Sequence, residues 1–299
     1  MHTVAPSAPA QDFALIVSLG HDACASISHF VPDEDLRIRR FYVDLEGSMA
    51  LPEDGQYALL ECAAEAHPSV LRAAAQATLA QLPAAWLHEA HIVILVADLS
   101  TAAGRHAALV WAQAMQTLKA PAFVVAITPK HLRGVECMQA ARAAVQQVRA
   151  LCPCMLVIDG ARLAALTEVA PYVHHACNTL SQTTNPYGHV NVDVDDMQSV
   201  LSVGHSYMGF GLAEPGDDMA TDVMEDALRG PLLSAHELHQ ASAVLVLLQA
   251  SRGTLRLSQS RAIMQQITRR VSTEAHVIYA AGYSEKWGTA VGLTVIAAL

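Results

Sequence analysis

The amino-acid sequence predicts an α/β protein in which a doubly wound, mostly parallel sheet is followed by a central helix and a smaller α+β domain. Over residues 13–165, apolar runs of strand length alternate with helical segments, which is the pattern of βαβ units. After residue 188 this alternation gives way to several strands separated by few helices. A chain of 299 residues is also longer than one hydrophobic core usually needs, so we expect two packed domains.

The elements of the first domain follow from apolar runs and from helix-favouring composition. The run at 92–97, I-V-I-L-V-A, is apolar at every position, as in a parallel strand that is buried on both faces. The stretch 58–82 is rich in alanine and is expected to be helical. The predicted strands are 13–19, 37–45, 92–97, 122–127 and 155–158, and the predicted helices are about 25–30, 58–82, 105–118 and 134–151.

The second half begins with a helix at 171–180. Val173, Ala176, Cys177 and Leu180 recur at the spacing of one helix face, and Pro171 suits the first turn. The stretch after residue 188 predicts about four strands with fewer helices between them. These elements are helices at 197–202, 218–228 and 258–270 and strands at 206–213, 243–249, 276–281 and 292–298.

Composition and charge restrict the class of protein. The chain is 53% hydrophobic and 15% charged with a net charge of −10, which argues against nucleic acid and anionic membranes as partners. No apolar run reaches about 18 residues, so no membrane span is expected. Residues 1–12 lack the basic start of a signal peptide and are expected to form a disordered lead.

Cysteine and histidine usage predicts no metal site. The six cysteines are scattered, which fits a reducing, cytoplasmic location. Cys152 and Cys154 are close in sequence, but C-P-C at the start of a strand is expected to be a buried pair. The fifteen histidines include no pair at the i, i+4 spacing of helical metal ligands, and the adjacent His174 and His175 should point in different directions.

The most informative stretch is Gly188–Met197, which reads G-H-V-N-V-D-V-D-D-M and contains Asn191, Asp193 and Asp196. Aspartates at the start of a helix commonly cap its free N–H groups, and the spacing alone favours this interpretation. Carboxylates in such a run can also orient a water molecule for attack on a phosphate. The residues alone leave both interpretations open.

Several motifs in order resemble those of the bacterial tubulin homologue FtsZ, and the resemblance extends from Phe13 to Leu299. The run N-V-D-V-D-D is similar to the N-L-D-F-A-D synergy loop of that family. Further similarities are M-G-F-G-L-A-E-P-G-D-D at 208–218, G-P-L-L at 230–233, V-G-L-T-V-I-A-A at 291–298, Ile127-Thr128 with Leu132-Arg133-Gly134, and the segment 156–163.

This resemblance implies a tubulin/FtsZ-like organisation and head-to-tail assembly. A GTPase-like nucleotide domain is expected at 13–165, the central helix and linker at 166–187, and the C-terminal domain at 188–299. In such filaments the synergy loop of one subunit completes the GTP site of the next. Asn191, Asp193 and Asp196 are the positions that would act on a neighbouring subunit in this way.

The nucleotide-binding segments depart from the family pattern. The slot of the family's G-G-G-T-G-T-G reads S-T-A-A-G-R-H, and only Gly104 remains there. A phosphate loop needs consecutive backbone N–H groups at close range, and each added Cβ obstructs that approach. The positions of this degenerate site are Gly20, His21, Asp22, Ser100, Thr101, Gly104, Arg105 and Arg133, the last of which stands where the family has a glutamate that faces the ribose.

Charge at these positions also disfavours a triphosphate. Asp98 stands in place of a glycine before the loop, and Asp22 lies in the first loop. A carboxylate about 5 Å from a phosphate charge costs about 3 kcal/mol at an effective dielectric constant near 20. We therefore expect a pocket filled by its own side chains, including an Asp98–Arg105 pair. Binding of GTP or GDP is expected to be weak or lost, with Mg²⁺ only where GTP binds.

Three functions are consistent with these features. The first is a pseudo-GTPase that assembles with itself or with a conventional FtsZ and serves as a filament subunit, cap or regulator. The second is a divergent, active GTPase that polymerises and holds phosphates through Ser100, Thr101, Gly104 and Arg105. The third is a nucleotide-free binding scaffold. Because the sequence stops at Leu299, we expect no C-terminal tether peptide of the FtsZ type and no direct membrane binding.

Overall fold

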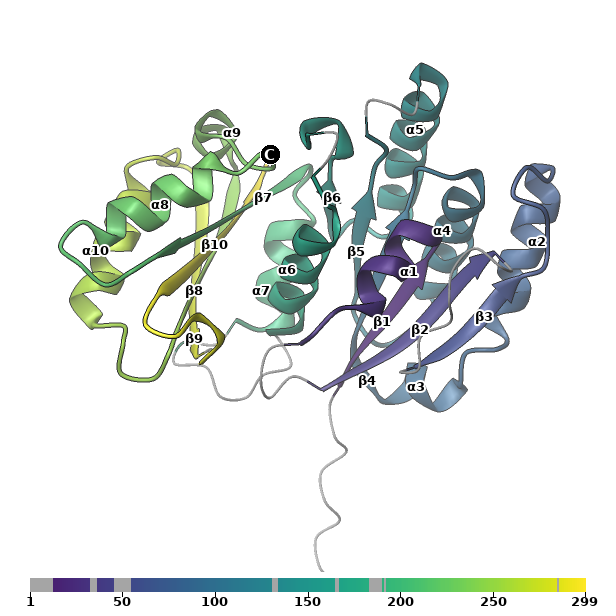
Figure 1. The fold of residues 1–299 in the computed structure, drawn as a ribbon, viewed down its shortest axis with the longest axis horizontal. Helices are drawn as coiled ribbons and strands as arrows, with labels where there is room; N and C mark the ends of the chain where they lie inside the picture. Colours follow the sequence, from purple (N-terminus) through teal and green to yellow (C-terminus); the bar gives the residue numbers. More distant parts are fainter. Residues whose placement is uncertain are drawn as a thin grey trace, which may run out of the picture.

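The computed structural model describes residues 13–32, 37–45, 55–130, 134–164, 167–182, 190, 192–283 and 285–299. The predicted lead at 1–12, Arg133 and Asn191 lie outside these residues. The described strands form a ten-stranded sheet in the order β3-β2-β1-β4-β5-β6-β7-β10-β8-β9 (Figure 1). The predicted α/β class, with a parallel sheet that continues into a smaller mixed part, is confirmed.

The N-terminal half is a parallel sheet. Every strand pairing from β3 to β6 is parallel. The strands are β1 (Phe13–Leu19), β2 (Ile38–Leu45), β3 (Gln56–Leu60), β4 (Ala90–Asp98), β5 (Ala122–Ile127) and β6 (Met155–Ile158). The helices are α1 (His21–Ser28), α2 (Pro68–Leu79), α3 (Ala84–Glu89), α4 (Ala102–Met115), α5 (Val135–Leu151) and α6 (Ala170–Ser181), with a 3₁₀ turn η2 (Gly160–Arg162).

Helices cover both faces of this sheet, as the doubly wound prediction requires. Successive residues of β1 point to opposite faces, because side chains alternate along a strand. Ile16 belongs to an apolar cluster that includes Ile27 of α1 and Leu180 of α6. Its neighbour Val17 belongs to the cluster on the other face, which includes Trp111 of α4 and Val148 of α5. The apolar runs of the sequence are therefore buried on both sides.

The C-terminal half contains four strands of the sheet, as predicted. Strand β10 pairs antiparallel with β7 and β8, and β9 pairs parallel with β8. Helices α8 and α10 share the apolar cluster on one face of these strands. The elements are α7 (Val194–Leu201), β7 (Ser206–Ala213), α8 (Met219–Arg229), α9 (Ala235–Gln240), β8 (Ala243–Ala250), α10 (Leu257–Thr268), β9 (His276–Tyr283), a 3₁₀ turn η4 (Glu285–Trp287) and β10 (Val291–Ala298).

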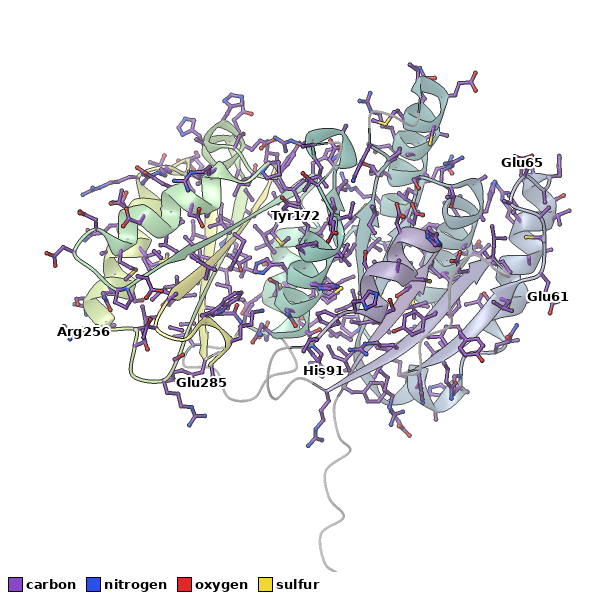
Figure 2. The ribbon with its side chains drawn as sticks, in the orientation of Figure 1. Glu61, Glu65, His91, Tyr172, Arg256 and Glu285 are labelled. Atoms are coloured by element: carbon purple, nitrogen blue, oxygen red, sulfur yellow. The ribbon has the colours of Figure 1, made fainter. Side chains whose placement is uncertain are left out.

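The two halves are joined by little sheet pairing and by the central helix α6. Strands β6 and β7 share one register pair, Leu156 with Ser206. On α6, Nε2 of His174 donates a hydrogen bond to the carbonyl of Ser26 at 2.6 Å, and Nε2 of His175 lies 2.7 Å from the hydroxyl of Thr294 on β10. Tyr172 of the same helix also lies between the halves (Figure 2). The two histidines point in different directions, as predicted.

The predicted helix at 58–82 is wrong in its first part. Strand β3 occupies Gln56–Leu60 and pairs with β2, and α2 begins only at Pro68. Proline lacks an N–H and fits the first turn of a helix, and the His67 side chain accepts the N–H of Ser69 at this start. The tertiary pairing with β2 therefore overrides the alanine-rich composition. The short helices α3 and α9 were not predicted.

The backbone of α4 lies close to the end of β4 at Gly104. A Cβ on Gly104 would be 1.9 Å from the carbonyl oxygen of Asp98 and 3.0 Å from Oγ1 of Thr101. Atoms cannot approach so closely, so this residue must be glycine for the helix to start where it does. Local packing alone accounts for this glycine.

We expect Gly104→Ala to lower the free energy of unfolding by about 1–3 kcal/mol, because the added methyl forces α4 away from β4. Denaturant unfolding followed by circular dichroism measures the change. Gly216→Ala is the matched control, because a Cβ at Gly216 has no atom within 4 Å. Equal stability of the two variants would contradict the close approach.

Candidate functional site

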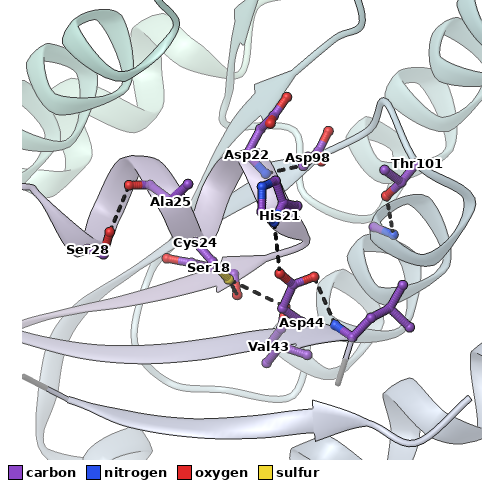
Figure 3. Close-up of polar contacts among 12 residues, drawn as sticks. Ser18, His21, Asp22, Cys24, Ala25, Ser28, Val43, Asp44, Asp98 and Thr101 are labelled. Carbon is purple, nitrogen blue, oxygen red and sulfur yellow. Dashed lines mark hydrogen bonds and ion pairs between the residues drawn. The ribbon is translucent and has the colours of Figure 1, made fainter. Parts of the chain in front are cut away.

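The predicted nucleotide-binding positions gather where β1 and β4 end. These strands are adjacent and parallel, so the loops after them meet at the same edge of the sheet. A Cβ on Gly20 would lie 3.2 Å from Cβ of Asp98 and 3.4 Å from Cα of Gly104. The two loops are therefore in direct contact, as Figure 3 shows for Asp22 and Asp98.

The Asp98 side chain joins the two loops. It is 0% exposed. Its Oδ1 accepts the backbone N–H of Ser100 at 2.8 Å, and its Oδ2 accepts the backbone N–H of Asp22 at 3.4 Å. Backbone N–H groups at such strand-to-helix turns are the groups that bind phosphate in nucleotide-binding proteins. Here an internal carboxylate accepts hydrogen bonds from one such group in each loop.

Burial raises the pKa of Asp98, and the nearby negative charge of Asp22 raises it further. The hydrogen bonds donated by Ser100 and Asp22 act in the opposite direction, because they stabilise the charged form. The charged carboxylate is thus costly in this position and depends on its backbone donors.

Arg105 does not form the expected pair with Asp98. It lies in the first turn of α4 and donates from Nη1 to the carbonyl of Leu99 at 3.1 Å. The Cα–Cβ bonds of a helix tilt toward its N-terminus, which directs this side chain back along the loop. Its neighbour His106 lies 3.5 Å from Nε of Arg72, and burial together with Arg72 and Arg105 lowers the pKa of His106.

The remaining loop residues have structural contacts. Thr101 caps α4, and its Oγ1 accepts the N–H of Gly104 at 3.0 Å. The hydroxyl of Ser100 has no hydrogen-bond partner among the described residues. Cys137 donates from Sγ to the carbonyl of Ser100 at 3.0 Å. Arg133, which was expected near the ribose, lies outside the described part of the chain.

Asp44 and Cys24 also lie at this edge and were not predicted as site residues. Nδ1 of His21 lies 3.6 Å from Oδ2 of Asp44, which is at the end of β2 and 8% exposed (Figure 3). Cys24 lies beside them, with Sγ 3.4 Å from the carbonyl of Ser18. Burial raises the pKa of the Cys24 thiol. Asp44 could have been noted because β2 was a predicted strand with an acid at its end.

The acidic stretch of the C-terminal half forms a helix cap. Asp193 is the N-cap of α7, and its Oδ1 accepts the N–H of Asp196 at 2.8 Å. In return, Oδ2 of Asp196 accepts the N–H of Asp193 at 3.2 Å, which completes a capping box. The Asp193 side chain is exposed. The capping interpretation is confirmed, and the action on a neighbouring subunit remains a prediction; Asn191 lies outside the described residues.

A short bridge fixes the residue before this cap. Val190 and Ala281 of β9 exchange two backbone hydrogen bonds, of 3.0 and 2.9 Å. Val192 is buried and packs in the apolar cluster that includes Met197 of α7. The acids are thus held at the surface by a strand contact before them and a helix after them.

Within the described ranges, no group of three or more histidine, cysteine, aspartate or glutamate side chains is placed to hold a metal ion. Cys152 and Cys154 are buried free thiols, and burial raises the pKa of each to about 11. No helix in the described part of the chain is long and apolar enough to cross a membrane.

Comparison with known proteins finds similarity to FtsZ proteins. Residues 204–298 match the model of the FtsZ family, C-terminal domain. The cell division protein FtsZ of Caulobacter vibrioides is 24% identical over 246 residues, which are 78% of this chain and 48% of that protein. The cell division protein FtsZ 1 of Halobacterium salinarum is 23% identical, over 82% of this chain and 58% of that protein. The chain therefore spans about half the length of these curated relatives.

Solved structures of similar fold cover nearly the whole chain. The FtsZ dimer of M. jannaschii, described as empty, matches with a TM-score of 0.81 and 17% identity over 96% of this chain and 88% of that one. CetZ2 from Haloferax volcanii, solved as a GTPγS-bound protofilament, matches with a TM-score of 0.74 and 15% identity over 96% and 92% of the two chains. These likenesses show the fold. With the family model over 204–298 and the curated relatives, they support a resemblance to a divergent FtsZ/tubulin-like protein.

Proposed function

We propose that this chain is a pseudo-GTPase that acts by assembly, with itself or with a conventional FtsZ, in a cell-division or cytoskeletal role. The observation that supports this most directly is the Asp98 carboxylate, which accepts backbone N–H groups from both loops of the nucleotide edge. A nucleotide phosphate needs the same kind of donor. The side chain thus competes for the groups that a phosphate would use.

The energetics support loss of nucleotide affinity. An entering phosphate must displace hydrogen bonds to a charged group, each worth about 1.5–3 kcal/mol. It also meets the charges of Asp98 and Asp22, and the Arg105 side chain is directed to the Leu99 carbonyl. The solved relatives CetZ1 and CetZ2 of Haloferax volcanii are described with bound GDP and GTPγS, so the fold itself can hold a guanine nucleotide. The proposed loss is specific to these loops.

Assembly is the function that needs no bound nucleotide in this chain. CetZ2 is described as a protofilament and the M. jannaschii FtsZ as a dimer, so subunits of this fold associate. The exposed Asp193 and its partner Asp196 are at the positions that act on a neighbour's nucleotide in the family pattern. A subunit that offers these acids without a nucleotide of its own would join one end of a conventional filament and stop growth there.

The first prediction concerns nucleotide content. We expect the purified, denatured protein to release no GTP or GDP on ion-exchange chromatography, and titration calorimetry with either nucleotide to show no micromolar binding. A conventional FtsZ purified in parallel is the positive control. Copurifying guanine nucleotide or micromolar heats would overturn the pseudo-GTPase and favour the divergent, active GTPase.

The second prediction concerns pH. Because the folded-state pKa of Asp98 is raised, the folded state binds more protons than the unfolded state between the ordinary aspartate pKa of 3.8 and the raised value. The contribution of Asp98 to stability therefore falls as pH rises through this window. We expect the free energy of unfolding of the wild type, relative to Asp98→Asn, to decline with increasing pH. A flat Asp98→Asn series would contradict burial of the charge.

The third prediction concerns assembly. At substoichiometric dose the wild type should reduce polymer formation by a conventional FtsZ in pelleting and light-scattering assays. The variant with both Asp193→Asn and Asp196→Asn should lose most of this inhibition of polymer formation, because asparagine can still cap the helix but carries no charge. The matched control is Ser234→Ala, which breaks the analogous capping box of α9 without touching these acids.

The outcomes of this assay separate the proposals. If the double asparagine variant acts like the wild type, the acids have no role in assembly. If the wild type neither affects FtsZ nor self-associates in analytical ultracentrifugation, the nucleotide-free scaffold is favoured instead.

A further inference from the structure

A cavity of about 440 Å³ lies where the two halves of the sheet meet. The cavity is lined by residues of α5, by Val157 of β6 and by the start of β7. The sheet has one register pair at this point, Leu156 with Ser206. The cavity lies beside the ends of β5 and β6, and its lining includes neither Asp98 nor the two residues that donate hydrogen bonds to Asp98.

The cavity wall combines apolar groups with cations. Met138, Val145, Val157 and Leu232 provide the apolar surface. Arg142 also lines the cavity, is exposed, and makes no hydrogen bond or ion pair with other described residues. Such a combination of an apolar body and a few polar groups is typical of small-molecule sites.

A second arginine follows Arg142 by two turns on the same helix face. Arg149 interacts electrostatically with His205 and Tyr207, which line the cavity, although Arg149 itself is not part of the lining. Its Nε and Nη2 are buried and have no hydrogen-bond partner among the described residues. These two N–H groups point in parallel, which is the geometry that binds a carboxylate or phosphate with two hydrogen bonds.

A third polar group at this place also lacks a partner. Ser206 lines the cavity, is 2% exposed, and its hydroxyl forms no hydrogen bond with the described residues. Buried polar groups are nearly always hydrogen-bonded, so this hydroxyl is available to an acceptor in the cavity.

The acidic side chains of the cavity region already have hydrogen-bond or ion-pair partners within the protein. Asp159 on the wall accepts the Thr128 hydroxyl and the N–H of Ala161, both at 3.0 Å. Glu237 pairs with Arg162 at 3.0 Å. Neither is a partner of Arg142 or Arg149, so the region has an excess of positive charge.

We propose that this cavity binds a small organic anion, with a carboxylate or phosphate head on an apolar body. The head is bound by Arg142, by the Nε–Nη2 edge of Arg149 after rotation of this half-buried side chain, and by the Ser206 hydroxyl. The body lies against the apolar residues of α5 and β6. A ligand in this position contacts both halves of the molecule where their strands share little pairing.

The test uses three probes of one shape: 1-naphthoate, 1-naphthyl phosphate and 1-naphthamide. Titrated into the full chain and followed by calorimetry and by NMR, at least one of the two anions should bind about tenfold or more tightly than the neutral amide, because a hydrogen bond to a charged group exceeds a neutral one. The better anion identifies the head group. Equal binding of all three probes, or no binding, overturns the proposal.

Variants locate the site. Arg149→Met and Arg142→Met should each weaken the better anion about tenfold or more, while Arg261→Met on the exposed face of α10 should leave it unchanged. Without ligand, Arg149→Met should also raise the melting temperature, because it removes a buried, unpartnered cation. Retained anion binding in both cavity variants would overturn the assignment, and Arg142→Met keeps the test decisive should Arg149→Met fold poorly.

Discussion

The buried Asp98 carboxylate is the contact on which the nucleotide edge of this molecule depends. It accepts backbone hydrogen bonds from Ser100, two residues ahead, and from Asp22, which is 76 positions away in the sequence. A buried charge is stable only where such donors surround it. The two loops are therefore held together by one side chain.

The same edge explains why so few glycines suffice there. In a phosphate loop, glycines let the backbone approach the ligand. In this chain Gly104 allows the backbone of α4 to approach the carbonyl of Asp98, and Gly20, with φ of 86°, starts α1. Both remaining glycines are required by contacts within the protein. Their presence is consequently no indication of nucleotide binding.

Much of the fold could be predicted because its strands are buried on both faces. The strands 13–19, 122–127, 155–158 and 206–213 lie where the apolar runs placed them. Strand β3 could not be predicted in this way, since Gln56 and Tyr57 are exposed and β2 is its neighbour in the sheet order. Its pairing partner, which the local composition does not contain, decides its structure.

The site was predictable in position but not in its contacts. The loops after β1 and β4 meet as expected, because parallel strands end at the same edge. The predicted pairing of Arg105 with Asp98 was wrong, because α4 starts at Ala102 and not near Arg105. Arg105 therefore lies in the first turn of α4, where its side chain reaches the Leu99 carbonyl. The capping box of Asp193 and Asp196 follows from short-range spacing, and such local hydrogen bonds are the ones that a sequence reveals best.

The adjacent histidines of α6 have a mechanical consequence. His174 is hydrogen-bonded to α1 and His175 to β10, and both histidines lie on one turn of α6. A rotation of one half relative to the other must therefore break at least one of these two hydrogen bonds, because adjacent residues of a helix rotate together. The central helix therefore couples the two halves rigidly, and a force applied to one half is transmitted through it to the other.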